Sequence, residues 1–153
     1  MNGAAMADDA AFKFSTDVRV RLPETDAFGV VYHGYYFTYF DVARMDYLRA
    51  IGLMDVVKAG RASNLIVHTA ADFKAPGRFD EELTVRTRIA EVGTTSFTFE
   101  FQVVRKGDGS RVATGCSVHV TVDHATLRPV PVPDELRQAV RAFEGPGLKE
   151  RSA

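Results

Sequence analysis

Residues 24–53 read "ETDAFGVVYHGYYFTYFDVARMDYLRAIGL", a polar turn that leads into a densely aromatic segment. An arc of about 100° per residue brings apolar residues of this segment onto one side of a helix. These residues are Tyr36, Phe40, Ala43, Tyr47, Ala50 and Ile51. Thr38, Asp46 and Arg49 fall on the opposite side. The pattern predicts one long amphipathic helix over residues 35–51, which ends near Gly52.

Apolar coverage of this helix extends to Phe37 and Leu48, which is wider than a flat sheet requires and indicates a surface that curves around it. Further along the chain, alternation with period two predicts long strands over residues 83–89, 97–103 and 112–122. The intervening turns "VGTT" (92–95) and "KGDGS" (106–110) are short enough for antiparallel hairpins. Residues 17–22 and 64–73 are two further expected strands. The sequence therefore predicts an α+β sandwich with an antiparallel sheet.

The alternation also assigns faces to the three long strands. The apolar register of the last strand contains Val112, Thr114, Cys116, Val118, Val120 and Val122. The opposite face is expected to be exposed to water. That face carries Thr84, Arg86, Arg88, Thr98, Glu100, Gln102, Ser117, His119 and Thr121.

Composition restricts the class of protein. The 153 residues are 46% hydrophobic and 25% charged, which is typical of one globular domain. Small and polar residues at 1–11 and the segment 145–153 are expected to be a disordered N-terminal tail and a flexible C-terminal tail, leaving a domain over residues 12–144. The net charge of −1 comes from scattered charges, which argues against nucleic acid as a partner. No membrane-spanning run or signal sequence is recognisable, and the single cysteine rules out an internal disulfide, so the expected location is the cytoplasm.

Four segments carry a resemblance to a known family. "TDAFGVVYHGYYFTYFDVAR" (25–44) resembles the N-terminal signature of hotdog-fold acyl-CoA thioesterases of the 4-hydroxybenzoyl-CoA thioesterase type. "DFKAPGRFDEEL" (72–83), "TTSFTFEFQV" (94–103) and "RPVPVPDELRQAV" (128–140) are similar to later segments of the family in the same order. The resemblance implies a hotdog fold, in which a curved antiparallel sheet wraps around one long central helix and a short helix follows at the C-terminus. It also implies a homodimer or a tetramer, with active sites between subunits.

The chemistry of a thioesterase suits the segment that opens this signature. Hydrolysis needs a group that attacks the carbonyl or activates water, and donors for the oxygen that becomes negative. A helix N-terminus offers N–H groups without intrahelical acceptors. The resemblance implies that Asp26 is the catalytic carboxylate and that the amide of His33 is the donor, assisted by Gly34. Whether Asp26 acts as nucleophile or as general base stays open.

The expected reaction converts an acyl-CoA thioester, or one on acyl-carrier protein, to a free acid and a thiol. No metal and no cofactor is expected apart from coenzyme A as part of the substrate. The substrate-binding candidates are Tyr36, Asn64, Thr95, Ser96 and Arg128. At the turn before Ser96, where the aromatic-CoA thioesterase has basic residues, this chain has only glycine and threonines, so no cation is expected there.

Other interpretations of these residues are open. A loop aspartate before a helix often only caps a turn, and Glu24 reads as an exposed turn acid or as a carboxylate partner of Asp26. The alternative role of Tyr36 is a core residue, that of Asn64 is a strand-edge cap, and that of Arg128 is an ordinary solvated arginine on the surface. Cys116 is expected to be a buried, unreactive thiol.

Two other functions compete with hydrolysis. One is a non-catalytic acyl-CoA-binding hotdog module. The other is a hotdog enoyl-CoA hydratase, for which the seven-residue interval between Asp26 and His33 is too wide.

Overall fold

The computed structural model describes residues 9–60 and 63–151. The helices are α1 (Tyr35–Ala50), α2 (Met54–Lys58) and α3 (Asp134–Glu144). The strands are β1 (Phe14–Arg19), β2 (Ser63–Phe73), β3 (Glu82–Val92), β4 (Ser96–Arg105), β5 (Arg111–Val122) and β6 (Lys149–Glu150). Short 3-10 helices span Asp9–Ala11, Leu22–Glu24 and Gly145–Gly147. The predicted long helix and five strands are confirmed, whereas α2 and β6 were not predicted.

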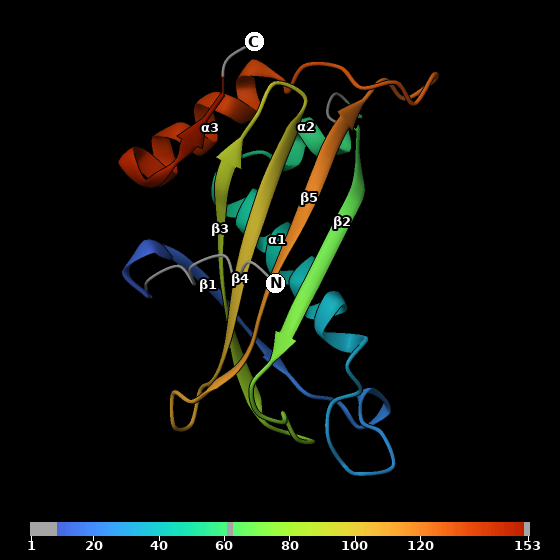
Figure 1. Cartoon of the computed structure of the whole chain (residues 1–153), viewed down its shortest axis with the longest axis vertical. Coiled ribbons are helices and arrows are strands. Elements are labelled where there is room, and N and C mark those ends of the chain that lie inside the picture. Colours follow the sequence, from blue (N-terminus) through green and yellow to red (C-terminus); the bar gives the residue numbers. More distant parts are fainter. Residues whose placement is uncertain (1–8, 61–62, 152–153) are drawn as a thin grey trace.

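The strands form one sheet in the order β1-β3-β4-β5-β2, and neighbouring strands along this path are antiparallel. β6 pairs with β3 in parallel. The sheet is twisted, and α1 lies across one face of it (Figure 1), in contact with β1 and β3. Among the described residues, no helix is long and apolar enough to cross a membrane.

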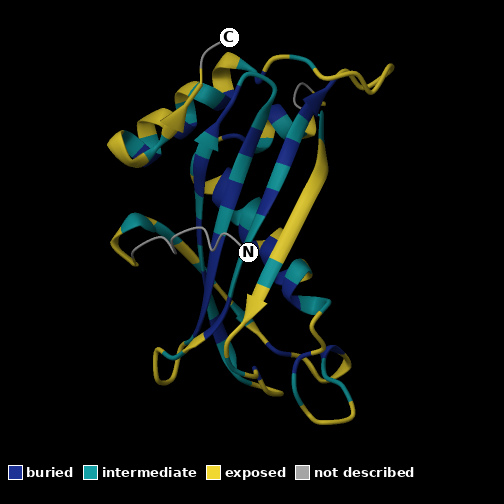
Figure 2. Cartoon of the chain, in the orientation of Figure 1, coloured by how far each residue is buried: buried dark blue, intermediate teal, exposed yellow. Residues whose placement is uncertain are grey.

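The core lies between α1 and the sheet, and the buried residues follow the two periodicities of the sequence. Alternate residues of β3 and β4 are dark in Figure 2 because they point toward α1. They meet the apolar stripe of the helix, where Phe40 stacks on Phe101 with ring centroids 4.5 Å apart. Tyr47 packs edge-on against Phe99 at 5.5 Å. Local alternation was enough to predict these two strands, because the two faces of each strand differ strongly from one another in polarity.

The predicted faces of β5 are wrong. Ser117, His119 and Thr121 are buried, and Cys116 is half-buried on the other face. The reason is the pairing with β4, in which Phe97 lies opposite His119 and the next inward phenylalanine lies opposite Ser117. Residues paired directly across two strands share a face, so the inward phenylalanines of β4 turn the polar register of β5 inward.

Gly115 belongs to this inward register and lets α1 approach the sheet. A Cβ atom at this position would overlap the Phe40 ring and lie 2.9 Å from the Ala70 carbonyl oxygen. These contacts are closer than van der Waals contact, so a side chain here would push the helix away from the sheet.

The outer face of the sheet is polar on β3 and β4, as predicted for those two strands. Arg88 donates to the Glu100 carboxylate at 2.8 and 2.9 Å. Gln102 is nevertheless buried, and it accepts a hydrogen bond from Arg86 at 2.6 Å. The Asp9 carboxylate lies 3.4 Å from the same arginine, so the first described residues cover part of this face. Residues 1–8 of the expected N-terminal tail lie outside the described residues.

α3 closes the end of the sheet beside β3. Its last residue, Glu144, is buried and accepts hydrogen bonds from the Tyr47 hydroxyl at 2.6 Å and the Ile89 N–H at 3.2 Å. Burial raises the pKa of the Glu144 carboxyl, and these hydrogen bonds only partly offset that effect. The segment after α3, which the sequence treats as a flexible tail, continues into β6, where Glu150 binds Arg141 at 2.8 Å.

Candidate active site

Asp26 lies in a tight turn that its own side chain closes. The Asp26 N–H donates to the Val30 carbonyl and the Gly29 N–H donates to the Asp26 carbonyl, both at 2.9 Å. The Phe28 N–H donates to Asp26 Oδ1 at 2.8 Å. Gly29 has a φ of +75°, a conformation that glycine adopts at low cost. Asp26 therefore has the turn role proposed as an alternative, yet its second carboxylate oxygen receives no hydrogen bond from the described residues.

The start of α1 presents unused N–H groups. At the helix start, the Tyr35 N–H donates to the Tyr32 carbonyl at 2.9 Å, and the Tyr36 N–H donates to the His33 carbonyl at 3.2 Å. Within residues 9–60 and 63–151, the N–H groups of His33 and Gly34 have no protein acceptor. This arrangement is what an oxyanion-binding helix N-terminus requires.

Long-range hydrogen bonds hold the segment between the carboxylate turn and the helix. The Tyr32 N–H donates to the Glu24 carbonyl at 2.9 Å, and the Val31 N–H donates to the Gly77 carbonyl at 2.8 Å. Val30 forms an isolated β-bridge with Arg78. The position of the turn therefore depends on the loop formed by residues 74–81.

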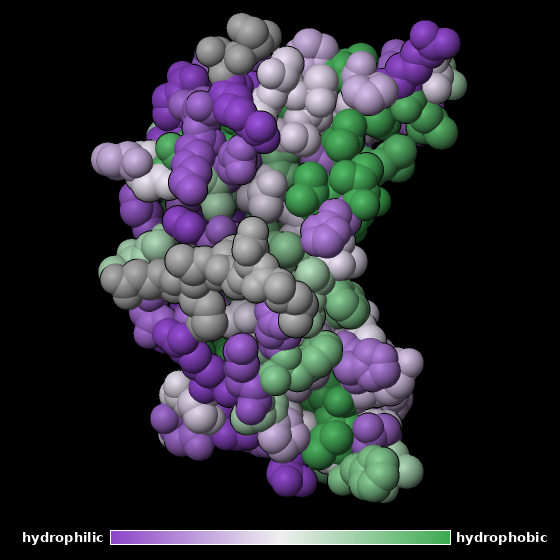
Figure 3. All heavy atoms as spheres, viewed as in Figure 1, coloured by the Kyte–Doolittle hydropathy of each residue, from purple (hydrophilic) through white to green (hydrophobic). Residues whose placement is uncertain are grey.

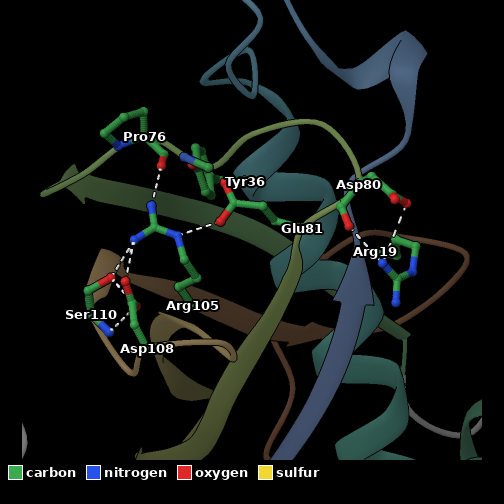
Figure 4. A network of polar contacts seen from close by, with 9 residues as sticks. Arg19, Tyr36, Pro76, Asp80, Glu81, Arg105, Asp108 and Ser110 are labelled. Carbon is green, nitrogen blue, oxygen red and sulfur yellow. Dashed lines mark hydrogen bonds and ion pairs between the residues drawn. The ribbon is translucent and has the colours of Figure 1, made fainter.

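Arg105 of β4 fixes that loop (Figure 4). Its guanidinium donates to the Pro76 carbonyl at 2.7 Å, forms an ion pair with Glu81 and reaches Asp108 at 3.3 Å. The neighbouring Gly77 N–H donates to the Tyr36 hydroxyl at 3.2 Å, which ties the loop to the first turn of α1. Arg105 was not recognised in the sequence, because its partners in the loop, Glu81 and Pro76, lie 24 and 29 residues earlier in the chain.

Glu24 differs from both sequence interpretations. It is 3% exposed and accepts a hydrogen bond from the Tyr39 hydroxyl at 2.8 Å. The Arg21 N–H and guanidinium donate to the same carboxylate at 2.7–2.9 Å. Burial by itself raises the pKa of Glu24, but these hydrogen bonds outweigh it and hold the pKa below its usual value. Glu24 is thus a buried anchor under α1, and the prediction of an exposed turn acid was wrong.

Tyr36 lies between the core and the surface of this site. It is 3% exposed, and burial raises the pKa of its hydroxyl. Its ring lies 5.4 Å from that of Phe73, which is half exposed at the end of β2. The Phe73 ring is also 6.3 Å from the His33 imidazole. Phe73 is a side chain at the site that the sequence did not single out.

The other substrate-binding candidates lie at the opposite end of the sheet. Asn64 Oδ1 accepts a hydrogen bond from the Thr121 hydroxyl at 3.0 Å, and the Thr95 carbonyl accepts one from the Thr121 N–H at 2.8 Å. Ser96 begins β4 next to Thr95, and Arg128 is exposed in the loop that follows β5. β2 separates the two ends with its eleven residues, about 35 Å of extended chain. One chain therefore does not bring all eight candidates together.

A cation does lie at the β3–β4 turn, contrary to the prediction. Arg137 of α3 donates to the Gly93 carbonyl at 2.6 Å. The sequence could not show this because α3 is more than 40 residues away.

The buried polar register of β5 forms a second polar cluster that the sequence missed. His119 Nε2 lies 2.8 Å from the Ser117 hydroxyl oxygen, and its ring stacks on Phe97 with centroids 5.2 Å apart. Burial, with a smaller contribution from the nearby Arg44 charge, lowers the pKa of His119 to about 4. The imidazole is therefore neutral at pH 7. No cluster of three or more metal-ligating side chains occurs in the part of the chain that the structure describes.

Comparison with known proteins places the chain in a family. Residues 20–140 match the model of the "Thioesterase-like superfamily", and the chain belongs to that family. The predicted family and hotdog fold are thereby confirmed.

Several relatives have names that state an activity. The "Acyl-CoA thioesterase YbgC" of Haemophilus influenzae is 31% identical over 129 residues, covering 82% of this chain and 93% of the relative. A thioesterase from Thermus thermophilus, solved in complex with coenzyme A and Zn, is 27% identical with a TM-score of 0.76, covering 88% of this chain and 96% of that one. The DHNA-CoA thioesterase of Staphylococcus aureus is 25% identical with a TM-score of 0.78, covering 90% and 97%.

Proposed function

We propose that this protein hydrolyses acyl-CoA thioesters at the N-terminus of α1. The observation that carries the proposal is the pairing of a carboxylate turn with an unsatisfied helix start on one hydrogen-bonded segment. The Asp26 carboxylate has an oxygen without a protein donor, and the N–H groups of His33 and Gly34 have no protein acceptor among the described residues. The names of the relatives support the same reaction.

In the reaction, the thioester oxygen accepts hydrogen bonds from the His33 N–H and the Gly34 N–H. Asp26 either attacks the carbonyl carbon itself or removes a proton from the water that attacks it. In both routes the carbon–sulfur bond breaks, coenzyme A leaves as the thiol after gaining a proton, and negative charge on the oxygen is held by the helix N-terminus. The general-base route forms the free acid directly. The nucleophilic route first forms a mixed anhydride that water then hydrolyses.

A homodimer would complete the site. β2 is an edge strand whose residues Leu65, Ile66 and Val67 are 44%, 48% and 59% exposed. Figure 3 shows hydrophobic side chains gathered along the side where β2 runs. Antiparallel pairing of two β2 strands about a two-fold axis would place the Asn64 end of one copy beside the Phe73 end of the other. The two groups of substrate-binding candidates would then meet between subunits.

In this dimer, Arg128, Thr95 and Ser96 of one copy would contact the coenzyme A part of a substrate bound at the other. Sedimentation at micromolar concentration is expected to give at least twice the mass of one chain. A monomer under these conditions would contradict the shared site. A thioester carried on acyl-carrier protein is the competing substrate, so each acyl group should be offered on both carriers and kcat/KM compared.

The first test of the proposed chemistry is Asp26→Asn. The amide keeps the shape of the side chain and can still accept the Phe28 N–H bond, but it is neither a base nor a nucleophile. We expect kcat to fall by about 10² or more with the fold and mass unchanged. Activity within threefold of the parent would remove Asp26 from the mechanism.

The second test compares His33→Ala with His33→Pro. Alanine retains the N–H and should lower kcat by about tenfold or less, whereas removal of an oxyanion donor costs about 10²–10³. Proline lacks the N–H and is tolerated near a helix start, so folded protein can be checked by circular dichroism. Equal damage from both variants would instead make the imidazole the working group, as in a hydratase. Binding of acyl-CoA without any turnover would indicate the non-catalytic module.

A further inference from the structure

Asp26 lies at the tip of a small hairpin that ends directly before His33. The Asp26 N–H donates to the Val30 carbonyl, and the Tyr32 N–H donates to the Glu24 carbonyl, both at 2.9 Å. An isolated antiparallel β-bridge lies between these two bonds. The hairpin therefore carries the candidate carboxylate on its first arm, and the candidate oxyanion donor follows its second arm.

This hairpin has few buried side chains with which to hold its own position. Phe28, at its tip, is 87% exposed. Of residues 24–33, only Glu24 and Val31 are buried. The Val31 N–H bonds to the loop of residues 74–81. Of the two buried side chains, only that of Glu24 can form a hydrogen bond with α1, at whose N-terminal end the hairpin lies (Figure 1).

The Glu24 carboxylate makes this connection. Its Oε1 atom accepts a hydrogen bond from the Tyr39 hydroxyl at 2.8 Å, and Arg21 donates to both of its oxygens at 2.7–2.9 Å. A hydrogen bond to an ionised carboxylate is shorter and stronger than one between neutral groups. Tyr39 follows Gly34 by five residues, which is about 8 Å along the helix axis. The hydroxyl contact therefore fixes the hairpin relative to the first turn of α1.

Neither member of this pair can reach a substrate. Glu24 and Tyr39 are each 3% exposed, and the Tyr39 ring packs edge-on against that of Tyr36 at 5.8 Å. An effect of the pair on the reaction therefore passes through Asp26 and His33. Such an effect is large, because a displacement of reacting groups by about 1 Å can lower the rate about 10²-fold.

We propose that Glu24 and Tyr39 are positioning residues of the active site, and that their hydrogen bond sets the place of the Asp26 carboxylate relative to the N–H groups at the start of α1. The inference rests on the proposed thioester hydrolysis, and it adds two residues that act on the reaction without touching the substrate. Loss of the hydrogen bond lowers the rate of the chemical step and leaves substrate binding in place.

Tyr39→Phe is the first test, because it removes only the hydroxyl and keeps the buried ring. We expect kcat to fall by about 10- to 100-fold, since the carboxylate and the oxyanion donors are no longer held in one geometry. KM should change by less than about threefold, because the acyl and coenzyme A parts of the substrate keep their contacts.

Tyr47→Phe is the matched control. Tyr47 lies eight residues further along α1, and its hydroxyl donates to another buried carboxylate, that of Glu144, at 2.6 Å. Both variants should lower the urea midpoint of unfolding, because each leaves a buried carboxylate without one of its donors. Only Tyr39→Phe should lower the kcat of protein that circular dichroism shows to be folded in the assay. The proposal is overturned if Tyr39→Phe keeps kcat within about threefold of the parent, if it raises KM instead, or if Tyr47→Phe lowers kcat equally.

Glu24→Gln tests the other member of the pair. The amide keeps the size of the side chain, but its NH2 group faces a donor where the carboxylate offered an acceptor. We expect a fall in kcat similar to that of Tyr39→Phe. Because both substitutions break one hydrogen bond, the double variant should have a kcat within about threefold of the slower single variant. Losses that multiply would show that the two residues act independently and would refute the pair.

Amide hydrogen exchange measured by NMR separates this proposal from the proposed reaction, because it needs no turnover. In Tyr39→Phe, the Asp26 and Tyr32 amides that close the hairpin should exchange at least about threefold faster than in Tyr47→Phe. If the parent hydrolyses no thioester, the proposed reaction fails, and this comparison by itself decides the positioning role. Equal exchange in the two variants refutes that role, even if the parent hydrolyses thioesters.

Discussion

Acidification should destabilise this protein through His119. In the folded protein the imidazole is 1% exposed, stacked on Phe97 and beside the Ser117 hydroxyl, and its pKa is lowered from 6.5 to about 4. In the unfolded chain it takes up a proton near pH 6.5. Because the unfolded state binds the proton first, the stability that neutral His119 contributes is present above pH 6.5 and is lost as the pH falls toward 4.

The magnitude follows from the two pKa values. One pKa unit corresponds to about 1.4 kcal/mol, so the interval from 6.5 to about 4 is worth about 3 kcal/mol. Between pH 7 and pH 5, linkage gives a loss of about 2 kcal/mol from this residue alone. That is a large part of the 5–15 kcal/mol or so by which domains are usually stable.

Urea unfolding followed by far-UV circular dichroism measures this loss, since the chain has no tryptophan to serve as a fluorescent probe. Free energies of unfolding at pH 7, 6, 5 and 4.5 should be compared for the parent and His119→Gln at one protein concentration. The variant should be less stable at pH 7, and its deficit should shrink by about 2 kcal/mol at pH 5. His124→Gln, at an exposed position after β5, is the matched control and should keep the parent's pH dependence. If His119→Gln also keeps it, the buried imidazole is not the source and the reasoning fails.

Three further predictions concern other parts of the fold. Arg105→Met should lower the free energy of unfolding in urea by about 2–3 kcal/mol and should also lower kcat/KM, because the loop of residues 74–81 loses its anchor. Lys106→Met, on the surface, is the control and should lower the free energy of unfolding by less than about 1 kcal/mol. Gly115→Ala should cost about 1–3 kcal/mol by thermal or urea unfolding, while Gly107→Ala, in open space, should change stability by less than about 0.5 kcal/mol. Burial raises the pKa of the Glu144 carboxyl, so the folded state keeps this proton to a higher pH than the unfolded chain does, and the free energy of unfolding should fall as the pH rises above 4.5. Glu144→Gln should remove that fall. A variant that keeps the parent's pH dependence would contradict the prediction.

Some features of the protein follow from the sequence alone because they depend on neighbours along the chain. The apolar stripe of α1 and the alternation of β3 and β4 are local periodicities. The structure reproduces both, except that Ala50 at the end of the predicted stripe is exposed. The carboxylate turn and the helix start are also local. Asp26, Gly29, His33 and Gly34 lie within nine residues, so their hydrogen bonding follows from the turn itself.

Tertiary structure decided the features that depend on strand pairing and on contacts between distant segments. The valine-rich register of β5 predicts the wrong inward face, and only the pairing of β5 with the phenylalanines of β4 buries His119 rather than Cys116. Glu24 became an anchor because Tyr39 of α1 lies over it. A small pocket lined by Arg44, Asn64 and Phe97 joins side chains of α1, β2 and β4 that meet only after the sheet and helices have packed. Periodicity reports which residues of one element share a face, whereas the partners of that face are set by chain segments that no local pattern connects.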